Sequence, residues 1–171
     1  QRPFRVGETI TAGTVTGTVQ AIGLFTTEVQ QLDGLYVMVP NNELWNKPIV
    51  NFSRMPTRRF ELLIGIGYED SIAEAKAELL ALAAEDARVL AEPAPVVFVS
   101  ALADSAVMLG LRVWCQTSDY LGLSWALTEA AKRRFDAAGI STSATSSLPL
   151  ATLAARYSGR WSQTTSRHAS G

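Results

Sequence analysis

Residue types that commonly carry out catalysis are few in this sequence, and their spacing does not favour an active site. The only histidine, His168, lies in a C-terminal segment rich in Ser, Thr and Ala, so the rest of the chain cannot assemble a histidine-based triad or metal centre. Asp104 and Ser105 could form a nucleophile pair but are more typical of a hairpin turn. The Gly-Ile-Gly sequence at residues 65–67 lacks the third glycine of a dinucleotide-binding motif. We therefore expect a protein that is not an enzyme and that uses no cofactor or metal.

Composition narrows the class of protein further. The 171 residues are 47% apolar, which is typical of a globular chain. Fifteen Lys and Arg against sixteen Asp and Glu give a net charge of −1, so there is no overall basic surface for nucleic acid or an anionic membrane. A single cysteine, Cys115, excludes an intramolecular disulfide. No run approaches the roughly 18 apolar residues typical of a membrane-spanning helix, so we expect the chain as given to be soluble.

The basic residues form two local groups. Arg2 and Arg5 flank Pro3-Phe4 at the start of the chain, and Arg54, Arg58 and Arg59 lie around residue 55, where the sequence pattern changes. Such residues can form an ordinary solvated surface, or they can line an opening through which ions pass. Both interpretations remain open from the residues alone.

The elements that would position these groups fall into two domains. In residues 1–54, glycines punctuate short β-branched runs, which predict strands at 8–12, 14–22, 25–31, 35–39 and 49–52 and hence a small β-barrel. Pro40 and the asparagines after it predict the end of a strand. Residues 55–140 predict the order strand, helix, strand, strand, helix, in which Ser71 caps the first helix and Gly139 ends the second. With one more strand, that order is a ferredoxin-like α+β unit. Residues 141–171 predict a mobile tail.

Several segments, in order and at their spacing, resemble one known family. These are "RPFRVGETI", "GTVQAIGLFTTEV", "DGLYVMVPNNEL", "IVNFSRMPTRRFELLIGIGYED" and "LRVW". From about Arg2 to Ile140 the chain is similar to the cytosolic region of small-conductance mechanosensitive ion channels of the MscS type. The resemblance implies an Sm-like (SH3-like) β-barrel followed by a ferredoxin-like domain. It further implies a homoheptamer whose cytosolic domains form a hollow vestibule with side portals.

The resemblance also implies positions for the basic residues. A pore-lining helix of the family runs directly into the Arg-Pro-Phe sequence, which would place Arg2 and Arg5 at the pore mouth. Arg58, Arg59 and Glu61 would line the portals. The family's transmembrane helices are absent from this chain, so we interpret it as a part of such a channel, joined to the membrane through upstream helices.

The C-terminal region departs from the family pattern. Members usually continue after Gly-Ile with a proline-rich strand, which is missing after Ile140, so we expect the ferredoxin-like sheet to lack its closing strand. A frameshift in the coding sequence is one open explanation, and a native tail is the other.

Two functions follow. The first is the vestibule of an inner-membrane channel, on the cytoplasmic side, that opens under membrane tension and releases ions and small osmolytes in hypo-osmotic shock. The alternative is a free-standing Sm-like and ferredoxin-like binding module, for example for nucleic acid. Near-neutral charge and the lack of aromatic pairs on a basic sheet count against the alternative, so we expect no nucleic acid as a partner.

Overall fold

A computed structural model describes residues 2–147, which divide into two compact units, residues 2–55 and 56–147. Each unit has its own hydrophobic core and its own sheet. Within residues 2–147, no helix is both long and apolar enough to cross a bilayer.

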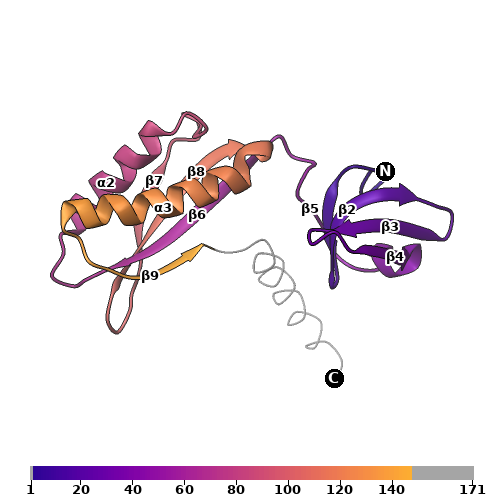
Figure 1. The fold of residues 1–171 in the computed structure, drawn as a ribbon, viewed down its shortest axis with the longest axis horizontal. Helices are drawn as coiled ribbons and strands as arrows, with labels where there is room; N and C mark the ends of the chain where they lie inside the picture. Colours follow the sequence, from indigo (N-terminus) through magenta and orange to yellow (C-terminus); the bar gives the residue numbers. More distant parts are fainter. Residues whose placement is uncertain (1, 148–171) are drawn as a thin grey trace, which may run out of the picture. The chain divides into compact units, whose positions relative to one another are not determined.

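The first unit is an Sm-like β-barrel built from a five-stranded antiparallel sheet (Figure 1). Its elements are β1 (Thr9–Ala12), β2 (Val15–Ile22), β3 (Thr26–Gln31), β4 (Tyr36–Pro40), α1 (Asn41–Trp45) and β5 (Ile49–Asn51), with strand order β4-β3-β2-β1-β5. All five strands lie within one residue of their predicted bounds. The core contains the alternate, inward-pointing residues of these strands together with Phe4 from the N-terminal segment and Leu44 from α1.

Helix α1 was not predicted, although the strand before it ends where Pro40 indicates. The side chain of Asn41 holds the start of this helix against the β2–β3 loop. Its Oδ1 accepts a hydrogen bond from Thr27 Oγ1 at 2.7 Å, and its Nδ2 donates to the carbonyl oxygens of Gly23 and Leu24. In the sequence "VPNN", Asn41 therefore binds the β2–β3 loop through its side chain, in addition to following the end of strand β4.

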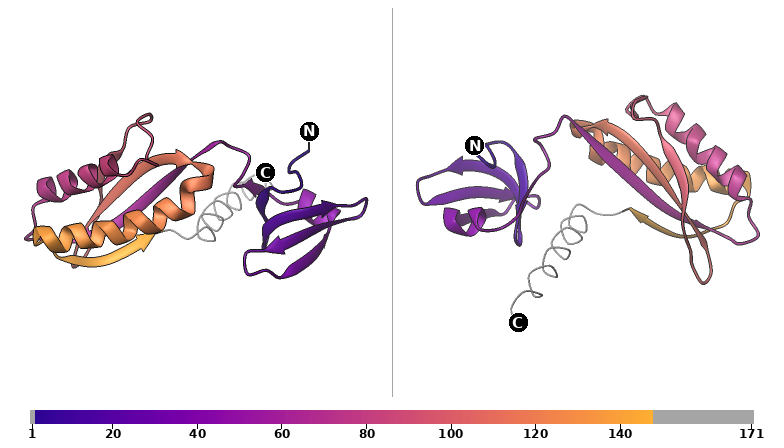
Figure 2. Two further views of the ribbon diagram at one scale, coloured as in Figure 1. Left: turned by 45° about the horizontal axis from the view of Figure 1, so that its top comes forward. Right: turned by 180° about the vertical axis from the view of Figure 1, so that it is seen from behind.

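The second unit has the ferredoxin-like βαββαβ order. Its elements are β6 (Thr57–Ile66), α2 (Ile72–Glu85), β7 (Val96–Leu102), β8 (Val107–Gln116), the 3-10 turn η1 (Thr117–Asp119), α3 (Tyr120–Ala138) and β9 (Thr142–Ser147), with antiparallel strand order β7-β8-β6-β9. The Ser71 side chain accepts a hydrogen bond from Glu74 N, and Gly139 ends α3 in the left-handed conformation, both as predicted. In Figure 2 both helices lie on one face of the sheet.

Strand β9 contradicts the prediction that the sheet lacks its closing strand. Residues 142–147 pair with β6 in antiparallel register, for example Leu63 opposite Ser146 and Ile66 opposite Thr142. The strand is anchored where it begins, because Ser141 N and Oγ both donate to Asp70 Oδ2. The rest of the predicted mobile tail, residues 148–171, lies outside the described residues.

Candidate functional site

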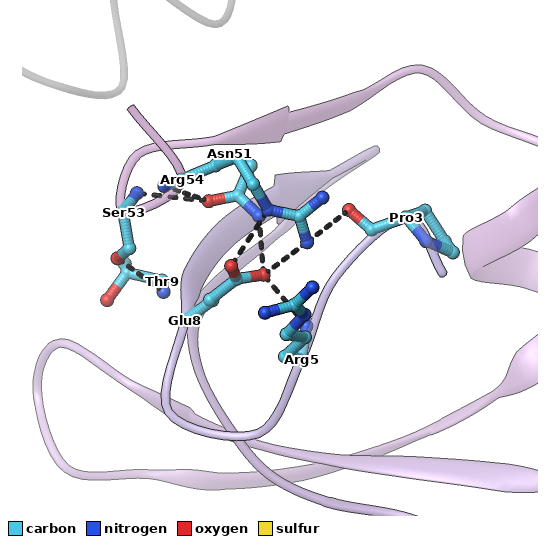
Figure 3. Close-up of polar contacts among 7 residues, drawn as sticks. All are labelled: Pro3, Arg5, Glu8, Thr9, Asn51, Ser53 and Arg54. Carbon is cyan, nitrogen blue, oxygen red and sulfur yellow. Dashed lines mark hydrogen bonds and ion pairs between the residues drawn. The ribbon is translucent and has the colours of Figure 1, made fainter. Parts of the chain in front are cut away.

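The most extensively hydrogen-bonded carboxylate of the first unit is that of Glu8 (Figure 3). Arg54 donates to it through two nitrogens, from Nε to Oε1 at 2.9 Å and from Nη2 to Oε2 at 2.8 Å. Asn51 Nδ2 and the backbone N–H of Arg5 also donate to Oε2, at 2.7 and 2.8 Å. Arg54 Nη2 additionally reaches the carbonyl oxygen of Pro3 at 3.4 Å. Glu8 and Arg54 thus connect the N-terminal segment, residues 2–6, to the end of the barrel.

Local sequence explains how Arg54 comes to face Glu8. After β5 the chain turns, and Asn51 Oδ1 accepts the backbone N–H groups of Ser53 and Arg54 at 3.0 and 2.9 Å. Ser53 Oγ in turn accepts the backbone N–H of Thr9 at 3.0 Å. The sequence Asn-Phe-Ser-Arg is therefore a side-chain-stabilised turn that directs the guanidinium group back towards the start of β1.

The ion pair strongly favours the charged form of Glu8. Its hydrogen bonds from Arg54 lower the pKa of the Glu8 carboxyl from 4.5 to about 2, against the opposing effect of partial burial, and Asn51 and the Arg5 N–H contribute in the same direction. The same pairing raises the pKa of Arg54. Glu8 therefore remains ionised at every pH at which the protein is expected to work.

This pairing makes the stability of the first unit sensitive to acid. Because the folded-state pKa of Glu8 lies below its ordinary value, its contribution is present above about pH 4.5 and is lost as the pH falls through about 2. We expect the urea concentration at which the first unit unfolds to fall more steeply between about pH 5 and pH 2 in the wild type than in Glu8→Gln. Hydrogen exchange at the backbone amides of β1 and β5 monitors this unfolding. Glu43→Gln, which removes an exposed carboxylate of the same unit, is the control for the loss of one negative charge. Equal slopes for the wild type and Glu8→Gln would contradict the assignment.

Arg2 and Arg5, predicted at a pore mouth, both lie on the N-terminal segment with exposed side chains. Between them Phe4 is only 2% exposed and packs in the core of the first unit. The segment is therefore anchored by an apolar side chain on one side and by the hydrogen bonds of Glu8 and Arg54 on the other.

The three residues predicted to line portals do not share one surface. They lie on β6, where successive side chains point to opposite faces. Arg58 is half-buried on the helix-covered face, with its guanidinium carbon 3.6 Å from the centre of the Tyr120 ring, and burial lowers its pKa. Tyr120 also makes an edge-to-face contact with the buried Phe60. Arg58 is thus part of the packing between β6 and α3.

Arg59 and Glu61 point to the opposite face of the sheet. Arg59 is exposed, and Trp114 is its partner on β8. Glu61 Oε2 accepts a hydrogen bond from Arg112 Nε at 2.7 Å, and the Arg112 guanidinium carbon lies 4.4 Å from the centre of the Phe98 ring. Of the three predicted portal residues, Arg59 is the one with an exposed side chain.

The described residues offer little for catalysis. They contain no group of three or more His, Cys, Asp and Glu side chains that could hold a metal ion. Asp104 and Ser105 lie in the turn between β7 and β8, which is closed by a hydrogen bond from Ala103 N to Ala106 O, as predicted. Cys115 is buried, and that burial raises the pKa of its thiol, which disfavours the reactive thiolate.

Comparison with known sequence families gives two consecutive matches. The profile described as "Mechanosensitive ion channel, beta-domain" matches residues 1–54, and that described as "Mechanosensitive ion channel MscS, C-terminal" matches residues 60–142. An uncharacterized MscS family protein of Synechocystis is 36% identical over 138 residues, which are 81% of this chain and 47% of that protein. The small-conductance mechanosensitive channel of Edwardsiella ictaluri is 35% identical over 139 residues, 81% of this chain and 49% of that channel.

Solved structures show the same arrangement of elements. The closed-state crystal structure of Helicobacter pylori MscS has a fold similar to this chain, with a TM-score of 0.78 at 23% identity over 84% of this chain and 57% of that one. The cryo-EM structure of MSL1 from Arabidopsis thaliana gives a TM-score of 0.70 at 26% identity over 84% of this chain and 54% of that one. The chain spans about half the length of the curated relatives it matches. With both of its domains matched, in order, by sequence profiles of one family, the chain belongs to the MscS family of mechanosensitive ion channels.

Proposed function

We propose that this chain is the cytosolic vestibule region of an ion channel that opens under membrane tension and releases ions and small osmolytes during hypo-osmotic shock. The observation that carries this proposal is the pair of MscS family matches, which together cover nearly all of residues 1–142 in the order β-domain, then C-terminal domain. In this function the chain performs no chemistry. It assembles around the ion path, supports the pore and filters what reaches it.

The rest of the channel supplies the membrane attachment. Every backbone polar group of a membrane-spanning segment needs a hydrogen-bond partner within the protein, which a helix provides. In the proposed arrangement, a pore-lining helix precedes Arg2, and the described domains lie on the cytoplasmic side of the inner membrane.

The proposed assembly is a homoheptamer with subunit contacts in the β-domain. Strand β4 is an edge strand of its sheet, and an edge strand is a position at which a neighbouring chain can pair. The first unit also exposes large apolar side chains on and beside β3 and β4, among them Leu24 (84%), Phe25 (79%), Tyr36 (58%) and Met38 (54%). Apolar exposure on this scale is typical of a surface that another protein covers.

The direct test uses the complete gene in a bacterial strain that lacks mechanosensitive channels of its own. We expect tension-activated currents in excised membrane patches and improved survival on transfer to dilute medium. Failure of a well-expressed, membrane-inserted protein to conduct at any tension short of patch rupture would refute the proposal.

Within this function, Arg59 should influence which ions pass. It is the exposed member of the proposed portal group, and symmetry repeats it in every subunit. We expect Arg59→Glu to shift ion preference towards cations, most visibly at low ionic strength, because exposed charges are screened beyond roughly 8 Å at physiological salt. The measurement is the reversal potential in asymmetric salt, with the opening tension recorded in the same patches.

Opening tension should change little in Arg59→Glu, since the work of gating is done by membrane-spanning segments. The matched control is Arg58→Lys, which keeps the charge but weakens the stacking on Tyr120, and it should leave ion preference unchanged. An unchanged reversal potential with a large shift in opening tension for Arg59→Glu would mean that this residue belongs to the mechanical linkage and not to the ion path.

A further inference from the structure

The N-terminal segment has no secondary structure to fix its direction. Residues 2–5 belong to no helix or strand. Their backbone is held by the Arg5 N–H donated to Glu8, by the Pro3 carbonyl that accepts from Arg54 Nη2, and by the Arg5 carbonyl that accepts from Glu8 N. Two of these three contacts depend on the side chains of Glu8 and Arg54. Glu8 lies at the start of the barrel and Arg54 at its end, 46 residues apart.

We infer that Glu8 and Arg54 form a positioning clamp, which fixes the backbone of residues 3–5 and thereby holds the charged groups of Arg2 and Arg5 at the ion path. The inference rests on the proposed function, in which these two arginines face the pore mouth. Glu8 and Arg54 themselves act only through the segment that they hold.

The geometry needs both members of the pair. Arginine presents a planar fork of donors that can bind both carboxylate oxygens and still reach a third acceptor, which is what Arg54 does with Glu8 and Pro3. Lysine keeps the charge but lacks the fork. In Glu8→Gln, one carboxylate oxygen is replaced by an amide NH2 group, which cannot accept a hydrogen bond. At least one of the donors that Glu8 now binds, from Arg5, Asn51 or Arg54, would therefore lose its acceptor.

The direction of the shift in ion preference distinguishes a positioning role of Glu8 from a direct effect of its charge. Removing the negative charge of Glu8 should, by electrostatics alone, make the region more positive and favour anions. If Glu8 instead holds Arg2 and Arg5 in place, its loss lets these positive charges move away from the path and favours cations. Arg54→Lys changes no charge, so electrostatics alone predicts no shift for it, whereas positioning predicts a shift towards cations.

The test measures reversal potentials of the full-length channel in asymmetric salt for Glu8→Gln, Arg54→Lys and the double variant Arg2→Gln/Arg5→Gln. We expect all three to shift towards cations, and Glu8→Gln to add nothing when combined with Arg2→Gln/Arg5→Gln. Glu43→Gln, an exposed carboxylate of the same unit, is the control for loss of one negative charge and should not shift towards cations. Opening under tension should persist in every variant.

A second measurement is independent of conduction. Hydrogen exchange on the purified channel should show the Arg5 amide exchanging about tenfold faster in Glu8→Gln, as expected from loss of one charge-assisted hydrogen bond, with exchange in β6 and β8 unchanged. This readout also identifies a variant that fails to fold, because a misfolded first unit would lose protection throughout β1–β5.

The outcomes are distinguishable. A shift towards anions in Glu8→Gln with none in Arg54→Lys would overturn the clamp, as would an unchanged exchange rate at Arg5. If Arg2→Gln/Arg5→Gln leaves ion preference unchanged while the channel still opens under tension, the positioning role fails and the proposed function stands. Absence of tension-activated current in the wild type would instead reject the proposed function, and the exchange rate at Arg5 would still decide whether Glu8 holds the segment.

Discussion

Replacing Gly17 with alanine should unfold the first unit at a markedly lower urea concentration than in the wild type. Gly17 lies on β2 and is paired with Gln31 of β3. A Cβ atom added there would come within 2.3 Å of the backbone oxygen of Gln30 and 2.7 Å of the Val29 side chain. Real Cβ atoms do not approach backbone oxygens this closely, so the two strands must separate.

The expected loss is about 3 kcal/mol, at the upper end of what overpacking a core costs, because a backbone group cannot rotate away as a side chain can. That is a large share of the stability of a small domain, which is typically about 5–15 kcal/mol. Hydrogen exchange resolved by segment is the measurement. Protection should fall in β2 and β3 and remain in β6 and β8, which belong to the second unit.

Gly34→Ala is the matched control. Gly34 also lies in the first unit, but a Cβ there would meet nothing within 4 Å, and the strain comes only from its φ of +88°. Its expected cost is about 1–2 kcal/mol, the penalty for an L-residue in the left-handed region. If Gly17→Ala proves no more destabilising than Gly34→Ala, the close approach of β2 and β3 is not as described.

Most of the fold could be predicted from sequence because its signals are local. β-branched runs between glycines specify the barrel strands, Ser71 and Gly139 mark helix ends, and alternation in β8 identifies its buried face. Helix α1 could not be predicted from the sequence, because its five residues are too few to show a helical period of apolar side chains. Its position depends on Asn41 contacting a loop some 17 residues away in sequence, which no local pattern reports.

The candidate site was less predictable for the same reason. The basic residues form clusters that are visible in the sequence, but the partner of Arg54 is Glu8, 46 residues away, and no local pattern indicates this pairing. The turn at Asn51 follows from a local rule, because an Asn side chain often accepts the backbone N–H group two residues further along the chain. That Arg58 and Arg59 point to opposite faces follows from strand periodicity, whereas the stacking of Arg58 on Tyr120 joins residues 62 apart and required the structure.

Strand β9 shows how an uninformative sequence can still complete a sheet. Residues 142–147 are Ser, Thr and Ala, which give neither an apolar alternation nor a turn signal. These residues pair with β6 through their backbone groups, and the apolar side chains of this strand pair belong to β6. Leu62, Ile64 and Ile66 of β6 are fully buried, and each is paired with a residue of β9.

Ending the chain at Ser141 should therefore destabilise the second unit substantially. The truncation keeps Ser141 and its hydrogen bonds to Asp70 but removes β9, which leaves one edge of β6 unpaired. We expect a loss of about 3 kcal/mol, because several ladder hydrogen bonds of about 1 kcal/mol each disappear while apolar surface beside β6 is uncovered. The exposed edge should also promote association between molecules.

Urea unfolding of the second unit and light scattering as a function of protein concentration measure the two effects. The control chain ends at Ser147, so that it keeps β9 and separates loss of this strand from loss of residues 148–171. We expect the chain ending at Ser141 to unfold at lower urea and to scatter more light at high concentration than the chain ending at Ser147. If the two chains have the same unfolding midpoint, β9 contributes no stability and β6 is an edge strand that the protein tolerates, as the sequence alone had suggested.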